Sequence, residues 1–103
     1  MLDLVKELCS LDGTSGREET VREYIINKIE GKCEYKVDPL GNILAFKKGK
    51  ETPKNKVMLS AHMDEVGFIV TYITDDGYIK FSNVGGIDGK VIAGRTVCFF
   101  QAG

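Results

Sequence analysis

The segment VMLSAHMDEVGFIV, residues 57–70, gives the strongest indication of how this chain folds. Its first five residues form an apolar run that is too short for a helix and lies between turn residues, so it predicts a strand buried on both faces of a sheet. The next four residues, His62-Met63-Asp64-Glu65, stand at the carboxyl end of that strand. Because α/β proteins usually place their sites at the carboxyl ends of strands, the segment predicts a functional site as well as a central strand.

Two of these four residues suggest metal-binding chemistry. In an extended backbone, residues two apart point to the same side, so His62 and Asp64 should face one cavity while Met63 faces the other. An imidazole that binds a metal commonly has its other ring nitrogen held by a carboxylate or a carbonyl, which fixes the tautomer. Glu65 is interpreted as a solvated or capping carboxylate. A lone His is more often structural than a ligand, so the spacing alone leaves metal binding and a structural role both open.

The first third of the chain predicts two helices. Apolar residues recur at three- and four-residue spacing over residues 2–11, which predicts a short amphipathic helix that ends near Asp12-Gly13. Ser15 and Glu18 have the spacing of a capping box, which predicts the start of a second helix. That helix carries one apolar stripe and should stop near Gly31.

The remainder predicts short strands separated by turns. Residues 33–37 and 42–47 should form a hairpin through Asp38-Pro39-Leu40-Gly41, and residues 68–74 and 77–82 a second one through Asp75-Asp76-Gly77. A last apolar run, residues 96–100, predicts one more strand. We therefore expect an α/β region over residues 1–66 and the start of an all-β module over residues 67–103. Because the chain stops directly after a predicted strand, we also expect it to be a truncated piece of a longer product.

Composition argues against several classes of function. Lys and Arg number 14 and Asp and Glu 15, so the chain lacks the basic excess that a nucleic-acid partner requires. No stretch approaches the length and apolarity of a membrane span, and the N-terminus interleaves charges with apolar residues, so we expect a cytoplasmic protein without a membrane partner. The three cysteines have wide, unpatterned spacings and are expected to be reduced core residues.

Residues 58–70 closely resemble the metal-binding segment of the glutamyl and tetrahedral aminopeptidases, which are cocatalytic dinuclear metallopeptidases, some of them labelled endoglucanases or cellulases. The resemblance extends in the same order over nearly the whole chain. LDGTSGREE (residues 11–19) is similar to the family's N-terminal helix junction, and DPLGNILA (residues 38–45) is similar to its first hairpin. VGGI (residues 84–87) and GRTV (residues 94–97) resemble the opening strands of its inserted dimerisation domain.

That resemblance implies a fold and a set of roles. The fold would be the N-terminal part of a mixed-sheet α/β metallopeptidase domain, followed by the start of an all-β inserted domain. His62 would bind one metal of a pair of Zn²⁺ or Co²⁺ ions, and Asp64, the candidate catalytic residue, would orient that ligand. The full-length protein would remove N-terminal residues from peptides and would assemble as a homo-oligomer. Most of the family's metal ligands have no counterpart in these 103 residues, so the chain by itself is expected to be inactive.

Two alternatives remain open on the sequence. A glycoside hydrolase would need two carboxyl groups across a sugar ring and no metal; nothing singles out such a pair, and the chain has no Trp to serve as a sugar platform. A non-enzymatic role in folding or assembly is the second alternative, because incomplete β-edges in residues 67–103 would recruit other chains.

Overall fold

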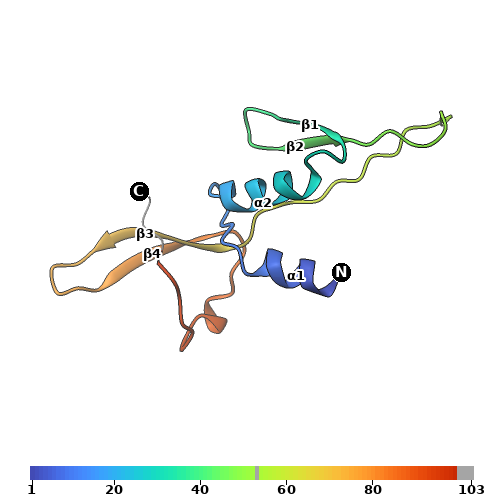
Figure 1. Ribbon diagram of the computed structural model, residues 1–103. Helices are drawn as coiled ribbons and strands as arrows, with labels where there is room; N and C mark the ends of the chain where they lie inside the picture. The colour runs from blue at the N-terminus through green and yellow to red at the C-terminus, as the bar shows by residue number, and fades with distance from the viewer. Residues whose placement is uncertain (53, 100–103) are drawn as a thin grey trace. The chain divides into compact units, whose positions relative to one another are not determined.

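The computed structural model describes residues 1–52 and 54–99. The chain divides into two compact units, Met1–Glu65 and Val66–Gly103. The elements follow one another as α1 (Leu2–Cys9), α2 (Glu19–Ile29), β1 (Glu34–Val37), β2 (Ile43–Phe46), β3 (Gly67–Ile73), β4 (Ile79–Val84) and the 3₁₀-helix η1 (Gly89–Val91) (Figure 1). The chain is thus a small α/β structure, with both α-helices in the first unit.

Helix α1 is shorter than its sequence pattern predicts. It ends at Cys9, where the N–H groups of Ser10 and Leu11 donate to carbonyls only three residues back, at 3.2 Å each. This tighter turn closes the helix before Asp12 is reached. Side chains then connect α1 to α2, because Glu7 accepts hydrogen bonds from the Tyr24 hydroxyl and, at 3.0 Å, from Lys28 Nζ.

Helix α2 lies where the apolar stripe predicts it, but the predicted capping box is wrong. The helix begins at Glu19 and has no side-chain cap. Glu18 instead accepts a 2.7 Å hydrogen bond from the Gly16 N–H, while the Ser15 N–H donates to the carbonyl of Glu65. The Ser15 backbone is therefore held by Glu65, a residue far away in the sequence, and not by a local capping box. The helix ends at Ile29, and Gly31 follows with a positive φ of 71°, as its sequence position predicts.

Both predicted hairpins are confirmed. Strands β1 and β2 pair antiparallel, with Val37 opposite Ile43 next to the turn. In that turn Asp38 Oδ1 accepts from the N–H groups of Leu40 and Asn42, both at 2.9 Å, and Oδ2 accepts from the Asn42 amide. These bonds, led by the one from the Asn42 side chain, hold the pKa of Asp38 below its usual value.

The second hairpin is longer and packs two aromatic rings. Strands β3 and β4 pair antiparallel from Gly67 opposite Val84 to Ile73 opposite Ile79, with one irregularity between Val70 and Tyr72. Phe68 and Phe81 meet edge to face with ring centroids 4.7 Å apart. The turn between the strands contains Gly77 at a φ of +88°, which favours glycine.

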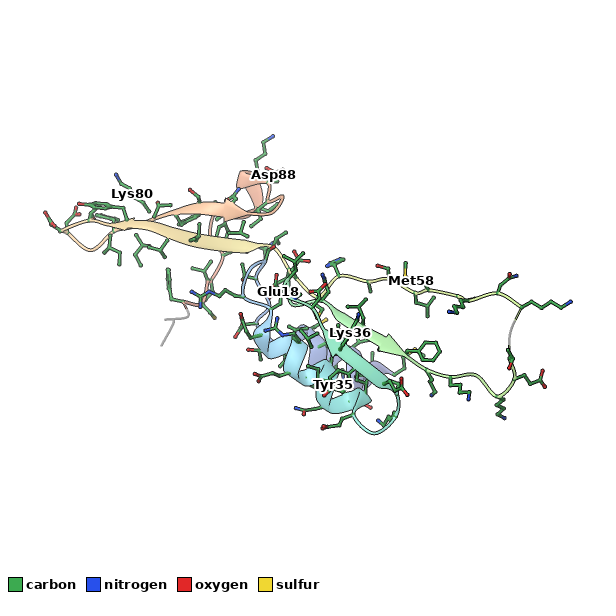
Figure 2. All side chains as sticks on the ribbon, turned by 90° about the horizontal axis from the view of Figure 1, so that it is seen from above. Glu18, Tyr35, Lys36, Met58, Lys80 and Asp88 are labelled. Atoms are coloured by element: carbon green, nitrogen blue, oxygen red, sulfur yellow. The ribbon has the colours of Figure 1, made fainter. Side chains whose placement is uncertain are left out.

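The predicted central strand over residues 57–61 is not formed. These residues are extended without strand pairing, and Val57, Met58 and Leu59 are 87%, 89% and 93% exposed. Figure 2 shows Met58 on a stretch of chain that is drawn without a strand arrow. The reason is physical: a strand needs a neighbour to take up its backbone hydrogen bonds, and no described segment supplies one.

Three other predictions from the sequence differ from the structure. The predicted mixed sheet is not seen among the described residues, where both sheets are antiparallel and the parallel pairing is an isolated bridge between Thr14 and Glu65. Residues 96–99 form no strand, and Phe100, the last residue of that predicted strand, lies outside the described residues. The prediction that the cysteines lie in the core is wrong, because Cys9 and Cys98 are exposed and Cys33 is half-buried. All three are free, as predicted. Val21, at 6% exposure, is the buried hydrophobic side chain of the described structure.

Candidate functional site

The segment of residues 57–65, which we call the site segment, is attached to the start of the chain through Glu65. Its N–H donates to the Gly13 carbonyl at 2.8 Å, and its own carbonyl accepts from the Ser15 N–H at 3.2 Å. The Glu65 side chain adds a third bond, because Oε1 accepts from the Gly13 N–H at 3.2 Å. The end of residues 57–65 is thereby fixed to the turn between α1 and α2.

His62 and Asp64 lie within hydrogen-bonding distance of each other. His62 Nδ1 is 2.9 Å from the backbone carbonyl oxygen of Asp64 and 3.1 Å from its Oδ1. A carbonyl oxygen can only accept, so a hydrogen bond there requires the proton to be on Nδ1. In the neutral ring this leaves Nε2 with a free lone pair, which is the form of imidazole that binds a metal.

Both side chains remain open to solvent. The side chain of His62 is 85% exposed and that of Asp64 is 41% exposed. Such an exposed pair contributes little to folding stability even when His62 is protonated. The contact therefore orients the ring more than it stabilises the chain, and Nε2 is accessible to a cation.

The described residues bring one imidazole to this site and no complete ligand set. No group of three or more His, Cys, Asp or Glu side chains in the described part of the chain could hold a metal ion. A shallow hollow on the β1–β2 hairpin is lined by residues 34–36 and 44–46 and includes neither His62 nor Asp64. The donor set fits one ligand of a metal centre, since catalytic zinc sites commonly take three protein ligands.

Two further residues of the site escape sequence reasoning. Glu65 makes side-chain and backbone bonds to Gly13, whereas its sequence context indicates only a solvated or capping carboxylate. Gly13 is buried beside Val21, whereas its sequence position indicates only the end of a helix. The two residues are 52 positions apart, so no local pattern joins them.

Over residues 1–52 and 54–99, no helix is long and apolar enough to cross a bilayer.

Comparisons with known proteins give one consistent family. A profile of the M42 glutamyl aminopeptidases matches residues 41–103. A candidate aminopeptidase of Acetivibrio thermocellus is 48% identical over 101 residues, which are 96% of this chain and 29% of that protein. Glutamyl aminopeptidase of Lactococcus lactis is 36% identical over 101 residues, covering 97% of this chain and 28% of the relative. The chain therefore spans less than a third of the length of these relatives.

Solved structures agree with that family. The TET1 peptidase of Pyrococcus horikoshii, which can assemble into a tetrahedron or a large octahedral shell, matches 88% of this chain and 27% of its own, with 39% identity and a TM-score of 0.76. A protein of Thermotoga maritima named endoglucanase matches 86% of this chain and 29% of its own, with 46% identity and a TM-score of 0.78. The profile match covers more than half of the sequence and the structural matches are close, so the chain belongs to the M42 glutamyl aminopeptidase family.

Proposed function

We propose that the natural protein is a metal-dependent aminopeptidase in which His62 Nε2 binds a divalent cation. One observation supports the proposal: the carbonyl and carboxylate oxygens of Asp64 lie within hydrogen-bonding distance of His62 Nδ1, which would leave Nε2 free to act as a ligand. Membership of a family named for aminopeptidases supplies the reaction class. A divalent cation held there would polarise a peptide carbonyl and lower the pKa of a bound water.

The roles of this chain's residues follow from their contacts. His62 would contribute one ligand nitrogen, and Asp64 would hold the ring in the tautomer and orientation that direct Nε2 outward. Imidazole and carboxylate ligands suit Zn²⁺ and Co²⁺ alike, so we propose one of these two, with two ions in each complete subunit. The substrate would be a peptide with a free N-terminus.

We also propose that the natural protein acts as a homo-oligomer. The support is the TET1 peptidase, which assembles into closed shells and matches 88% of this chain. The 103 residues alone are proposed to be inactive and to bind Zn²⁺ or Co²⁺ weakly, because a single imidazole leaves most of a coordination sphere to solvent.

The test uses the natural protein with an N-terminal aminoacyl-anilide substrate, combined with metal analysis by mass spectrometry. His62→Ala should reduce both hydrolysis and bound metal, and Asp64→Asn should weaken metal affinity by about 10- to 100-fold. Met63→Leu is the control, because this volume-conserving change lies between the two residues without altering either. Unchanged metal content in His62→Ala would refute the proposed ligand.

The Thermotoga maritima protein is named an endoglucanase, so the experiment must also distinguish a peptidase from a glycosidase. A chelator should abolish aminopeptidase activity, whereas a two-carboxylate glycosidase keeps its activity without metal. Hydrolysis of a soluble cellulose that survives the chelator, with no hydrolysis of the anilide substrate, would establish the glycosidase instead.

A further inference from the structure

We propose that Glu65 is a positioning residue that sets where the His62 imidazole stands. The inference rests on the proposed metal-dependent function, because it concerns the placement of the same ligand. Glu65 itself would touch neither metal nor substrate. Its action would run through its bonds to the turn formed by Gly13, Thr14 and Ser15, which we call the anchor turn.

Glu65 attaches a segment that has no strand partner of its own. Residues 57–61 have no strand partner and are exposed, so no strand pairing holds His62 from the N-terminal side. Within the described residues of the first unit, the backbone hydrogen bonds between residues 57–65 and the rest of that unit are those of Glu65 with Gly13 and Ser15. His62 lies three residues away, within about 10 Å along an extended chain.

The hydrogen bonds between Glu65 and Gly13 form a closed ring. Glu65 donates its N–H to the Gly13 carbonyl, and its carboxylate accepts the Gly13 N–H in return. Two bonds between the same two residues restrain rotation as well as distance, and the Ser15 bond to the Glu65 carbonyl adds a third point. An alanine at position 65 would keep both backbone bonds but would lose the one that restrains the Gly13 N–H.

The anchor turn is itself held in place by packing against α2. Gly13 is buried, and a β-carbon there would lie 2.7 Å from Val21 Cγ2. Val21 belongs to α2 and is the buried apolar side chain of the described residues. Residues 57–65 are thus connected, through Glu65 and Gly13, to the packed side chain of Val21 on α2. Catalytic geometry is sensitive at this scale, since a displacement of about 1 Å can reduce a rate by about 100-fold.

The experiment uses the natural protein carrying Glu65→Ala, Glu65→Asp or Glu65→Gln. Alanine removes the carboxylate, and aspartate keeps its charge but is one methylene too short to reach the Gly13 N–H. Both should lower kcat by about 10- to 100-fold, leave KM nearly unchanged, and weaken Zn²⁺ affinity in competition with a chelator by a similar factor. Glutamine retains an oxygen that can accept the same bond, so it should restore kcat and Zn²⁺ affinity to within about threefold.

Tyr24→Phe is the matched control for loss of stability alone. It removes the hydrogen bond from Tyr24 to Glu7 that links α1 to α2 and leaves the Glu65 bonds in place. It should lower Tm without changing kcat or Zn²⁺ affinity below the unfolding range. The absorption spectrum of the Co²⁺-loaded protein gives a readout independent of turnover, and it should change in Glu65→Ala but not in Tyr24→Phe.

Three results would overturn the proposal: kcat and Zn²⁺ affinity of Glu65→Ala equal to those of the unmodified protein, a loss in Tyr24→Phe as large as that in Glu65→Ala, or no recovery in Glu65→Gln. The proposed function fails in a different way. An unmodified protein whose aminopeptidase activity survives a chelator refutes the metal mechanism. An active, chelator-sensitive protein with an unaffected Glu65→Ala variant refutes only the positioning role.

Discussion

A β-carbon placed on Gly13 would lie 2.7 Å from Val21 Cγ2 and 3.4 Å from the carbonyl oxygen of Met63. The glycine thus lets the turn after α1 approach both helix α2 and the site segment. The φ of Gly13 is not positive, so glycine is not required here for an unusual backbone angle. It is required for space, because only glycine lacks a β-carbon.

Gly13→Ala should therefore lower the free energy of unfolding by about 1–3 kcal/mol, the usual cost of forcing an extra methyl group into a packed site. The measurement is urea unfolding of the natural protein. Gly86→Ala is the control, because a β-carbon there meets nothing within 4 Å and its φ is not positive. Equal unfolding midpoints for the two variants would contradict the packing argument.

At the scale of residues, sequence predicts contacts only when they are local. The contact between His62 and Asp64 follows from a separation of two positions in an extended backbone, and the structure shows it. The hydrogen bond between Glu65 and Gly13 joins positions 52 apart, so no local sequence pattern predicts it. The metal-binding role of His62 remains a prediction, since a single imidazole cannot define a metal site on its own.

Helices α1 and α2 are joined by a cluster formed by Glu7, Tyr24 and Lys28. The Tyr24 hydroxyl and Lys28 Nζ both donate to Glu7, and Lys28 Nζ also stands 4.9 Å from the centre of the Tyr24 ring. The hydrogen bond to Glu7 raises the pKa of Tyr24 above 10.0, and the same bond, followed by Lys28, lowers the pKa of Glu7. The cluster therefore responds to pH at both ends of the scale.

The expected pH dependence follows from the signs of the two shifts. The raised pKa of Tyr24 gives stability that is fully present below pH 10.0 and is lost as the pH rises through the higher folded value. The lowered pKa of Glu7 gives stability that is present above pH 4.5 and is lost as the pH falls through the lower folded value. The contact between α1 and α2 should accordingly hold throughout the neutral range.

Tyrosinate absorbance during an alkaline titration tests this prediction. One of the four tyrosines should ionise later than the others, and Glu7→Gln should return it toward 10.0 because the acceptor loses its charge. Glu23→Gln is the control, since it removes the same charge from α2 without touching the cluster. A Glu7→Gln titration curve that matches the unmodified one would show that the hydrogen bond does not set the Tyr24 pKa.

Elements are predictable where the neighbouring sequence supplies their partners. Both hairpins form as expected, because Asp38 and Gly41 in one turn and Gly77 in the other provide the turn within the element itself. Residues 57–61 also have strand character but do not pair, because no described segment provides a neighbouring strand for them. The capping box at Ser15 fails for the opposite reason, since a distant residue, Glu65, bonds the backbone there.

The whole chain exposes more surface than a folded chain of its size should. Its accessible area is 9464 Å². Two separate compact domains with the lengths of the two units would together expose about 6,900 Å² by the usual scaling of surface with mass. The difference does not depend on how the units are placed, and exposed apolar side chains such as Leu59, Ile69 and Phe99 account for part of it. Covering these side chains would be favourable, because transfer of apolar surface out of water lowers the free energy.

We therefore expect the 103-residue polypeptide, prepared alone, to self-associate and to bind a hydrophobic dye such as ANS. Exposed apolar area of this extent favours association, and unpaired extended segments provide edges for it. Light scattering should show species larger than 11.4 kDa, and thermal unfolding should be weakly cooperative. A compact monomer that unfolds in one sharp transition without binding dye would contradict this expectation.

A pair of lysine substitutions identifies which segment drives that association. Leu59 is the most exposed residue of the unpaired run at residues 57–59, so Leu59→Lys should reduce both the dye signal and the size of the associated species. Ser60→Lys adds the same charge at the adjacent exposed position without removing apolar area, so it should have a smaller effect. If both lysines reduce association equally, net charge is the cause. If only Leu59→Lys acts, the exposed apolar run at residues 57–59 is the surface that drives association.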